Sequence, residues 1–129
     1  MATIKKDVKL TATPEAVWEA LADFHHVHER LVPGVVVASK PEGDSVRIVT
    51  FANGLTVREE LISADPEARR LAYTASGGSL RHHNGVFKIR SDAEGCRLVW
   101  FIDFLPSEAA PAIEQLMDAG CAAMRRTLG

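Results

Sequence analysis

The sequence predicts an α+β fold, in which a curved, seven-stranded antiparallel sheet wraps around one long C-terminal helix and two short helices lie between the first two strands. Three observations lead to this prediction. A strand-like alternation opens the chain, six apolar runs separated by turn residues follow, and the closing segment has helical spacing. A chain of 129 residues has the length of one domain with one core, so a single domain over residues 1–129 is expected.

The first strand and the first helix follow each other directly. Residues 3–11 alternate as a half-buried strand does. One face of this strand carries Ile4, Lys6, Val8 and Leu10, and Lys6 is the one residue of this face that is not apolar. The segment TATPEAVWEALADF then predicts a helix over about residues 14–23, because Thr13 can cap it and Pro14 fits its first position.

The next stretch, DFHHVHERLVPGV at residues 23–35, predicts a second short helix and carries three of the five histidines in the chain. This helix has to end before the Pro-Gly step. Pro33 disfavours helical geometry at Val32, and Gly34 allows the chain to turn away.

Six apolar runs after this point are predicted to be strands: residues 35–39, 45–51, 55–63, 70–76, 82–90 and 96–104. The segments between them have the composition of turns, and Asn53 and Gly54 suit a two-residue primed hairpin turn. Strands joined this tightly have to form an antiparallel meander, since parallel neighbours need long crossover connections.

The closing segment, PSEAAPAIEQLMDAGCAAMRRTLG, predicts the longest helix, with Ser107 as its cap and Pro111 in its first turn. One stripe at three-four spacing is expected to face the sheet: Ala109, Ala112, Ile113, Leu116, Met117, Gly120, Cys121, Met124 and Leu128. Many of these side chains are small. Small side chains either leave a cavity between helix and sheet or permit close packing, and the pattern alone leaves both readings open.

The overall composition argues against several functional classes. The formal net charge of −2 gives no electrostatic reason to expect nucleic-acid binding. No apolar stretch has the length of a signal peptide or a membrane span, so a cytoplasmic protein is expected. Cys96 and Cys121 are too far apart for a CxxC motif and are expected to be free thiols.

Strand alternation predicts which polar side chains point toward the helix. If Val57 faces inward, Glu59 has to face inward with it. The inward polar and aromatic set from four strands is Glu59, Tyr73, His83 and Trp100. A buried carboxylate needs a partner, so Glu59 is expected to be protonated, to pair with His83 or Arg58, or to meet a ligand. A one-residue offset would instead expose Glu59 to water.

The histidines raise the question of a metal site. On a helix His25 and His28 share a face, so at most these two could converge with His83, and with Glu59 as a fourth ligand. Because the sequence has neither HExxH nor another spaced ligand motif, no metal is predicted. The preferred interpretation places the short helix at the mouth of a cavity, with one histidine lining the entrance as a hydrogen-bonding or pH-sensitive gate.

The whole chain resembles the START-like helix-grip superfamily, and more narrowly its SRPBCC group, which includes polyketide cyclase/dehydrase and lipid-transport-like domains. The segments that carry the resemblance are TPEAVWEALADFHHVHERLVPGV, VREELISADPEARRLAYT, GCRLVWFIDFLP and IEQLMDAGCAAMRRTLG. The resemblance implies a helix-grip fold around a deep apolar cavity. Relatives often carry a Trp shortly before the Pro-Gly step, where this chain has Arg30, Leu31 and Val32, so the entrance is expected to differ.

Two functions remain open after the resemblance is considered. The first is binding of a small hydrophobic or aromatic molecule, such as a lipid or polyketide-like compound, and the second is a polyketide cyclase or dehydratase in which Glu59, Tyr73 or His83 moves protons. The residues expected to contact the ligand are Glu59, Tyr73, His83, Trp100, His28, His25, Leu116, Met117 and Cys121. No cofactor is expected. A third class, ranked well behind these two, is an interaction or structural module, for instance a homodimer built through an exposed strand edge.

Overall fold

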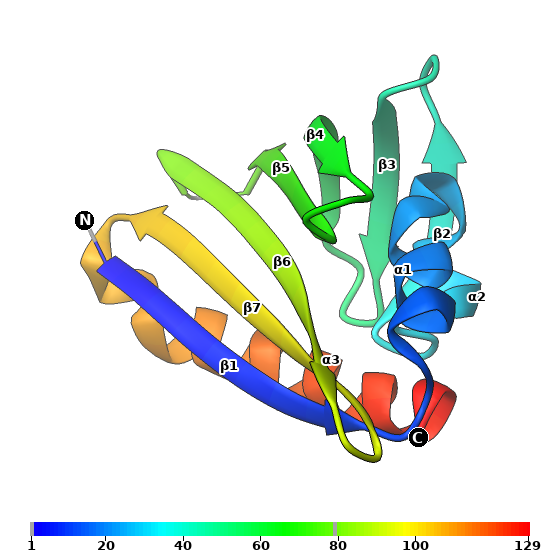
Figure 1. Cartoon of the computed structure of the whole chain (residues 1–129). Helices are drawn as coiled ribbons and strands as arrows, with labels where there is room; N and C mark the ends of the chain where they lie inside the picture. Colours follow the sequence, from blue (N-terminus) through cyan, green and yellow to red (C-terminus); the bar gives the residue numbers. More distant parts are fainter. Residues whose placement is uncertain (1, 79) are drawn as a thin grey trace.

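The computed structural model of the chain describes residues 2–78 and 80–129 and has the predicted α+β architecture (Figure 1). Its elements, in chain order, are β1 (Ala2–Leu10), α1 (Pro14–Ala22), the 3₁₀ turn η1 (Phe24–His26), α2 (Val27–Arg30), β2 (Val36–Pro41), β3 (Val46–Phe51), β4 (Thr56–Asp65), β5 (Arg70–Ser76), β6 (His82–Asp92), β7 (Gly95–Leu105), the 3₁₀ turn η2 (Ser107–Ala109) and α3 (Ala110–Leu128).

Within the described residues, seven strands form one antiparallel sheet in the order β1-β7-β6-β5-β4-β3-β2. β2 to β7 are the predicted meander, and β1 pairs with β7 along its length, from Ala2 opposite Phe104 to Leu10 opposite Cys96. The curved sheet and α3 form two layers (Figure 1), while α2 packs against β2 and α1 packs against α2 and β6. The helix-grip fold is therefore confirmed.

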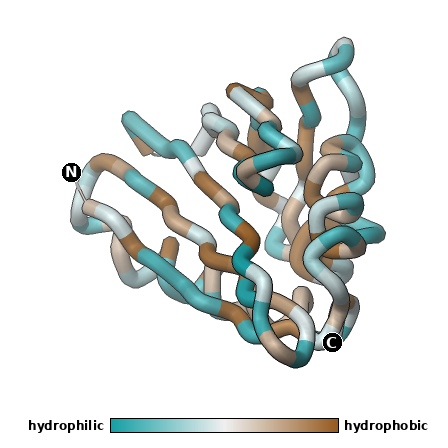
Figure 2. The backbone as a smooth tube through the Cα atoms, in the orientation of Figure 1, coloured by the Kyte–Doolittle hydropathy of each residue, from teal (hydrophilic) through white to brown (hydrophobic). Residues whose placement is uncertain are grey.

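Hydrophobic and hydrophilic segments are interspersed along the strands, as the tube in Figure 2 shows. The largest side chains with essentially no exposed surface lie between sheet and helices: Leu10, Leu71, Leu98, Ile102, Phe104, Met117 and Met124. Lys6, the exception on the apolar face of β1, reaches Glu114 and Asp118 on α3 at 2.6 and 2.9 Å. A cation on an edge strand is tolerated there because its ammonium group meets the acidic side of the helix.

The start of the first helix agrees with the sequence-based expectation. The Thr13 side chain accepts a hydrogen bond from the Ala16 N–H at 3.1 Å, and Pro14 is the first helical residue. The Thr13 side chain thus satisfies one backbone N–H that has no partner within the helix, and Pro14 has no N–H that would need a partner.

The predicted cap at Ser107 is wrong. The Ser107 hydroxyl donates to Glu108 Oε1 instead, and no side chain caps η2 or α3. The 3₁₀ turn supplies a backbone acceptor in place of the side-chain cap, since the Ala109 N–H donates to the Pro106 carbonyl at 3.1 Å.

The predicted two-residue turn between β3 and β4 is also wrong, because the connection has three residues, 52–54. The Phe51 N–H donates to the Leu55 carbonyl at 2.8 Å, which closes the loop, and the Gly54 N–H donates back to the Phe51 carbonyl at 2.9 Å. Gly54 has φ of +90°, the left-handed geometry that this loop type requires at its last position. The additional residue shifts the register of β3 against β4 by one.

Candidate functional site

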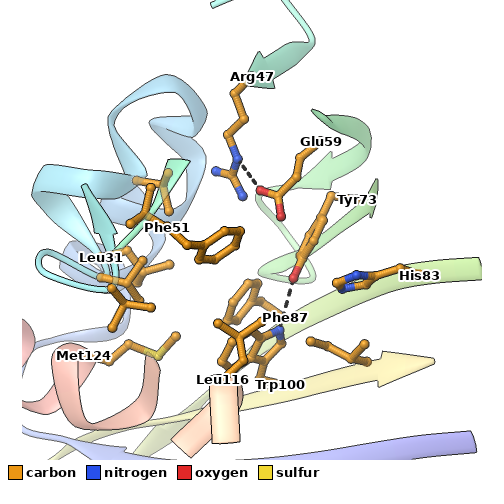
Figure 3. Close-up of a pocket in the computed structure, with 15 residues that line it drawn as sticks. Leu31, Arg47, Phe51, Glu59, Tyr73, His83, Phe87, Trp100, Leu116 and Met124 are labelled. Carbon is orange, nitrogen blue, oxygen red and sulfur yellow. Dashed lines mark hydrogen bonds and ion pairs between the residues drawn. The ribbon is translucent and has the colours of Figure 1, made fainter. Parts of the chain in front are cut away.

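A cavity of about 50 Å³ lies between the sheet and α3 (Figure 3). Its wall combines residues from all strands except β1 with residues from α2, α3 and the loop before β2: Val27, Leu31, Val32, Val35, Val36, Arg47, Phe51, Glu59, Tyr73, His83, Phe87, Trp100, Ile102, Leu116 and Met124. The wall is apolar over most of its surface. The polar side chains of Arg47, Glu59, Tyr73 and His83 lie together at one end of the cavity (Figure 3).

Three aromatic rings from β5, β6 and β7 form one side of the cavity. The rings of Phe87 and Trp100 are stacked with centroids 5.0 Å apart, and those of Tyr73 and Phe87 with centroids 6.2 Å apart. The strand register explains this row, because Phe87 lies opposite Trp100 and Tyr73 lies opposite Gly85. A side chain at Gly85 would collide with the Tyr73 ring, so the glycine allows the tyrosine to lie flat over its neighbour strand.

Glu59 faces inward as predicted, but it pairs with Arg47 and with neither of the expected partners, His83 and Arg58. Arg47 Nε donates to Glu59 Oε1 at 2.8 Å, and the side chains of both residues are less than a tenth exposed. Arg47 lies directly opposite Glu59 in the β3–β4 register. Arg58, one of the two expected partners, is instead exposed and pairs with Glu42.

Arg47 also joins the sheet to the segment that carries the histidines. Its Nη1 donates to the Phe24 carbonyl at 2.8 Å, and its guanidinium carbon lies 3.8 Å from the centroid of the Phe24 ring. The arginine thus satisfies a backbone acceptor of η1 and stacks on an aromatic face, two interactions that suit a planar guanidinium.

Tyr73 contributes a hydroxyl group that stays protonated. Trp100 Nε1 donates to the Tyr73 oxygen at 3.4 Å, as the dashed line in Figure 3 marks. Burial raises the pKa of Tyr73, and the nearby Glu59 carboxylate raises it further. Since the oxygen accepts from Trp100, the hydroxyl proton remains able to donate elsewhere.

His83 is the polar group at this end of the cavity whose hydrogen bonding is incomplete. Burial lowers the pKa of its imidazole, while the Glu59 carboxylate acts in the opposite direction with a smaller effect. The ring is therefore neutral at neutral pH. Its Nε2 atom is buried and has no hydrogen-bond partner among residues 2–78 and 80–129. A buried polar atom without a partner on a cavity wall is a site where a ligand can be recognised.

The other residues predicted to contact the ligand lie in three different places: the cavity wall, the core and the histidine-bearing segment. Leu116 lines the cavity, whereas Met117 and Cys121 are buried in the packing between α3 and the sheet and are not part of the lining. His25 donates from Nε2 to the Asp44 carbonyl at 3.1 Å, and His28 Nε2 lies 3.1 Å from Glu29. Neither histidine lines the cavity.

The separation of His25 from His28 has a structural reason. His25 belongs to the 3₁₀ turn η1 and His28 to the four-residue α2, so the two do not share a face of one continuous helix. The structure therefore does not bring these two histidines together with His83 and Glu59 as a set of metal ligands. In the described part of the chain no three His, Cys, Asp or Glu side chains are grouped as metal ligands.

The first prediction concerns the buried ion pair. Arg47→Met should lower the free energy of unfolding by about 3–5 kcal/mol, because it leaves the Glu59 carboxylate buried without its partner. Arg58→Met is the matched control, and it should cost less than about 1 kcal/mol since Arg58 forms an exposed ion pair. Urea unfolding of the two variants measures both values, and equal small losses would contradict the role given to Arg47.

The second prediction concerns pH. Because the pKa of folded His83 lies below that of an unfolded histidine, about 6.5, the unfolded chain binds the proton first as pH falls, and the folded state loses stability there. His26 acts in the opposite direction, since Asp23 raises its pKa. Wild type should therefore be compared with His83→Asn.

The stability of the wild type relative to His83→Asn should decrease between neutral pH and about pH 5.5, as measured by urea unfolding. A difference that is independent of pH, or that grows as pH falls, would show that burial does not disfavour the charged form of His83.

Comparison with known proteins is consistent with this architecture. The family model described as polyketide cyclase / dehydrase and lipid transport matches residues 1–129. No curated protein matches the chain. Among the described residues, no helix is both long enough and apolar enough to cross a membrane.

Several solved structures share the fold. The protein XoxI from Bacillus cereus is 20% identical, with 99% of this chain and 96% of that chain covered and a TM-score of 0.87. A protein from Thermobifida fusca is 28% identical, with 99% and 91% covered and a TM-score of 0.79. The Zhui aromatase/cyclase from Streptomyces sp. R1128 is 23% identical, with 98% and 90% covered and a TM-score of 0.69. With the family model matched along its whole length, the chain belongs to the polyketide cyclase/dehydrase and lipid transport family.

Proposed function

We propose that this protein binds a small apolar or aromatic molecule in the cavity between the sheet and α3. The observation that carries the proposal is the Nε2 atom of His83, which has no hydrogen-bond partner among the described residues and lies at one end of a cavity with an aromatic wall. Mostly apolar linings with a few convergent polar groups are typical of small-molecule sites. The aromatic wall supplies affinity, and the polar end supplies orientation.

The chemistry of the polar end favours a ligand with a hydroxyl group. A neutral imidazole has one nitrogen that accepts and one that donates, and a hydroxyl group can meet either. Arg47 and Glu59 compensate each other's charge, so the described wall of the cavity has no uncompensated charge to attract an ionic ligand. A neutral phenol or alcohol matches these groups, with its ring or chain against Phe87 and Trp100.

The proposal predicts a preference for a phenol over its methyl ether. Para-ethylphenol should bind about two- to tenfold more tightly than para-ethylanisole, because the phenol can either donate to or accept from the imidazole, whereas the ether can only accept. His83→Leu should remove this preference. The matched control is His82→Leu, since His82 is the exposed neighbour on the opposite face of β6. Isothermal titration calorimetry provides the affinities, and absence of saturable binding of both probes would contradict the proposal.

A second candidate function is proton transfer of the polyketide cyclase or dehydratase type. The arrangement that favours it is the convergence of His83, Glu59 and Tyr73 on one end of the cavity, with an imidazole in its basic form and a protonated phenol. His83 would accept a proton from the carbon next to a carbonyl group, and the Tyr73 hydroxyl would donate a hydrogen bond to the carbonyl oxygen. The similar fold of an aromatase/cyclase supports this candidate.

Proton transfer has a direct readout. If the second candidate is correct, the protein should accelerate exchange of the α-protons of α-tetralone in deuterated buffer, followed by nuclear magnetic resonance. His83→Leu should abolish the acceleration and His82→Leu should not. Binding of the ketone without accelerated exchange would leave the protein as a binding protein.

A further inference from the structure

A second hollow lies on the surface beside the cavity. It is a groove of about 350 Å³ between α3, the loop before β2 and the β3–β4 connection. Small residues form much of its wall, among them Gly34 and Ala52 on one side and Ala112 and Ala119 on the other. Ala112 and Ala119 are exposed, so the predicted sheet-facing position of Ala112 is wrong and its side chain faces this groove.

The groove and the cavity are separated by side chains. Val35, Phe51 and Leu116 belong to the walls of both hollows. Phe51 is the last residue of β3 and Leu116 lies in the middle of α3, and both are half-buried. Figure 3 shows the Phe51 ring and Leu116 projecting into the space toward Tyr73 and Trp100. The partition is thus made by one aromatic and two aliphatic side chains.

The backbone around the partition is held in place. The Ala52 N–H donates to the Val35 carbonyl at 3.0 Å, and the Val35 N–H donates to the Val32 carbonyl at 3.2 Å. These bonds join the β3–β4 connection to the loop before β2. Because the backbone is tied, the partition would open through rotation of the Phe51 and Leu116 side chains, neither of which is fully buried.

A ligand with an aromatic ring would require such an opening. At about 50 Å³ the cavity is smaller than the roughly 150 Å³ of an apolar protein cavity that accepts benzene. The groove wall carries the side-chain amides of Asn53 and Gln115, but among the described residues it has no buried polar atom that lacks a partner. Joined, the two hollows reach the range of about 300–1,000 Å³ that small-molecule sites occupy.

We propose that the cavity and the groove are two halves of one binding site, and that its ligand is an uncharged, elongated amphipathic molecule. Its hydroxyl-bearing ring lies in the cavity at His83, and its apolar chain passes between Phe51 and Leu116 into the groove. The inference rests on the proposed binding function. No residue of the groove wall in the described part of the chain is charged, and at the other end Glu59 neutralises Arg47, so both halves select against an ionic ligand.

The test is a series of phenols with para-ethyl, para-butyl and para-hexyl chains, titrated calorimetrically into the full-length protein. Each added methylene that enters the groove should tighten binding by about fourfold, the factor that corresponds to about 0.8 kcal/mol per buried methylene. In Ala119→Trp, which fills the groove from an exposed helix position, the hexyl compound should bind no more tightly than the ethyl compound. Ala64→Trp, on an exposed position of β4, is the control and should retain the full dependence on chain length.

The outcomes separate this inference from the proposed function. If the ethyl compound binds with the His83-dependent preference but affinity does not rise with chain length, the two-part site is wrong and the binding function stands. The same conclusion follows if Ala119→Trp keeps the chain-length dependence of the wild type. If none of the three phenols binds to the wild type, both the inference and the proposed function are contradicted.

Discussion

The buried ion pair between Arg47 and Glu59 is the interaction on which the candidate site depends. Both side chains are less than a tenth exposed, and buried charges are stable only when each is compensated. The Arg47 guanidinium donates to the Glu59 carboxylate and to a backbone carbonyl of η1, and it stacks on the ring of Phe24. One side chain therefore connects β3, β4 and the histidine-bearing segment. Because this pair neutralises the only buried charges in the described wall of the cavity, recognition there falls to neutral groups, the hydroxyl of Tyr73 and the imidazole of His83.

Most of the fold could be predicted from the sequence because its signals are local. Alternation gave the strands and the inward positions of Glu59, Tyr73 and Trp100, and helical spacing gave α1 and α3. The partner of Glu59 could not be found in the same way. Asn53 and Gly54 fit both a two-residue turn and the three-residue turn that the chain adopts, and the choice changes the residue opposite Glu59 from Ile48 to Arg47.

The cavity depends on residues whose importance is visible only in three dimensions. Gly85 leaves space for the Tyr73 ring, and a side chain at Gly120 would come within 2.9 Å of the Trp100 ring. Helical spacing marked the stripe of small residues on α3, but it could not say which of them pack and which remain open. Likewise, three histidines are clustered in the segment of the second helix, whereas His83, one of the pair on β6, is the histidine that lines the cavity.

Recognition in the cavity depends on a neutral His83 whose Nε2 atom forms a hydrogen bond with the ligand. The most direct measurement is the side-chain nitrogen chemical shifts of His83, assigned by comparison with His83→Asn, in the free protein and at saturating para-ethylphenol. We expect a neutral ring at neutral pH in the free protein and a change in the Nε2 shift when the phenol binds, with the shifts of His82 unaltered. A protonated His83 in the free protein, or an unchanged Nε2 shift while the phenol is bound, would contradict this role of His83.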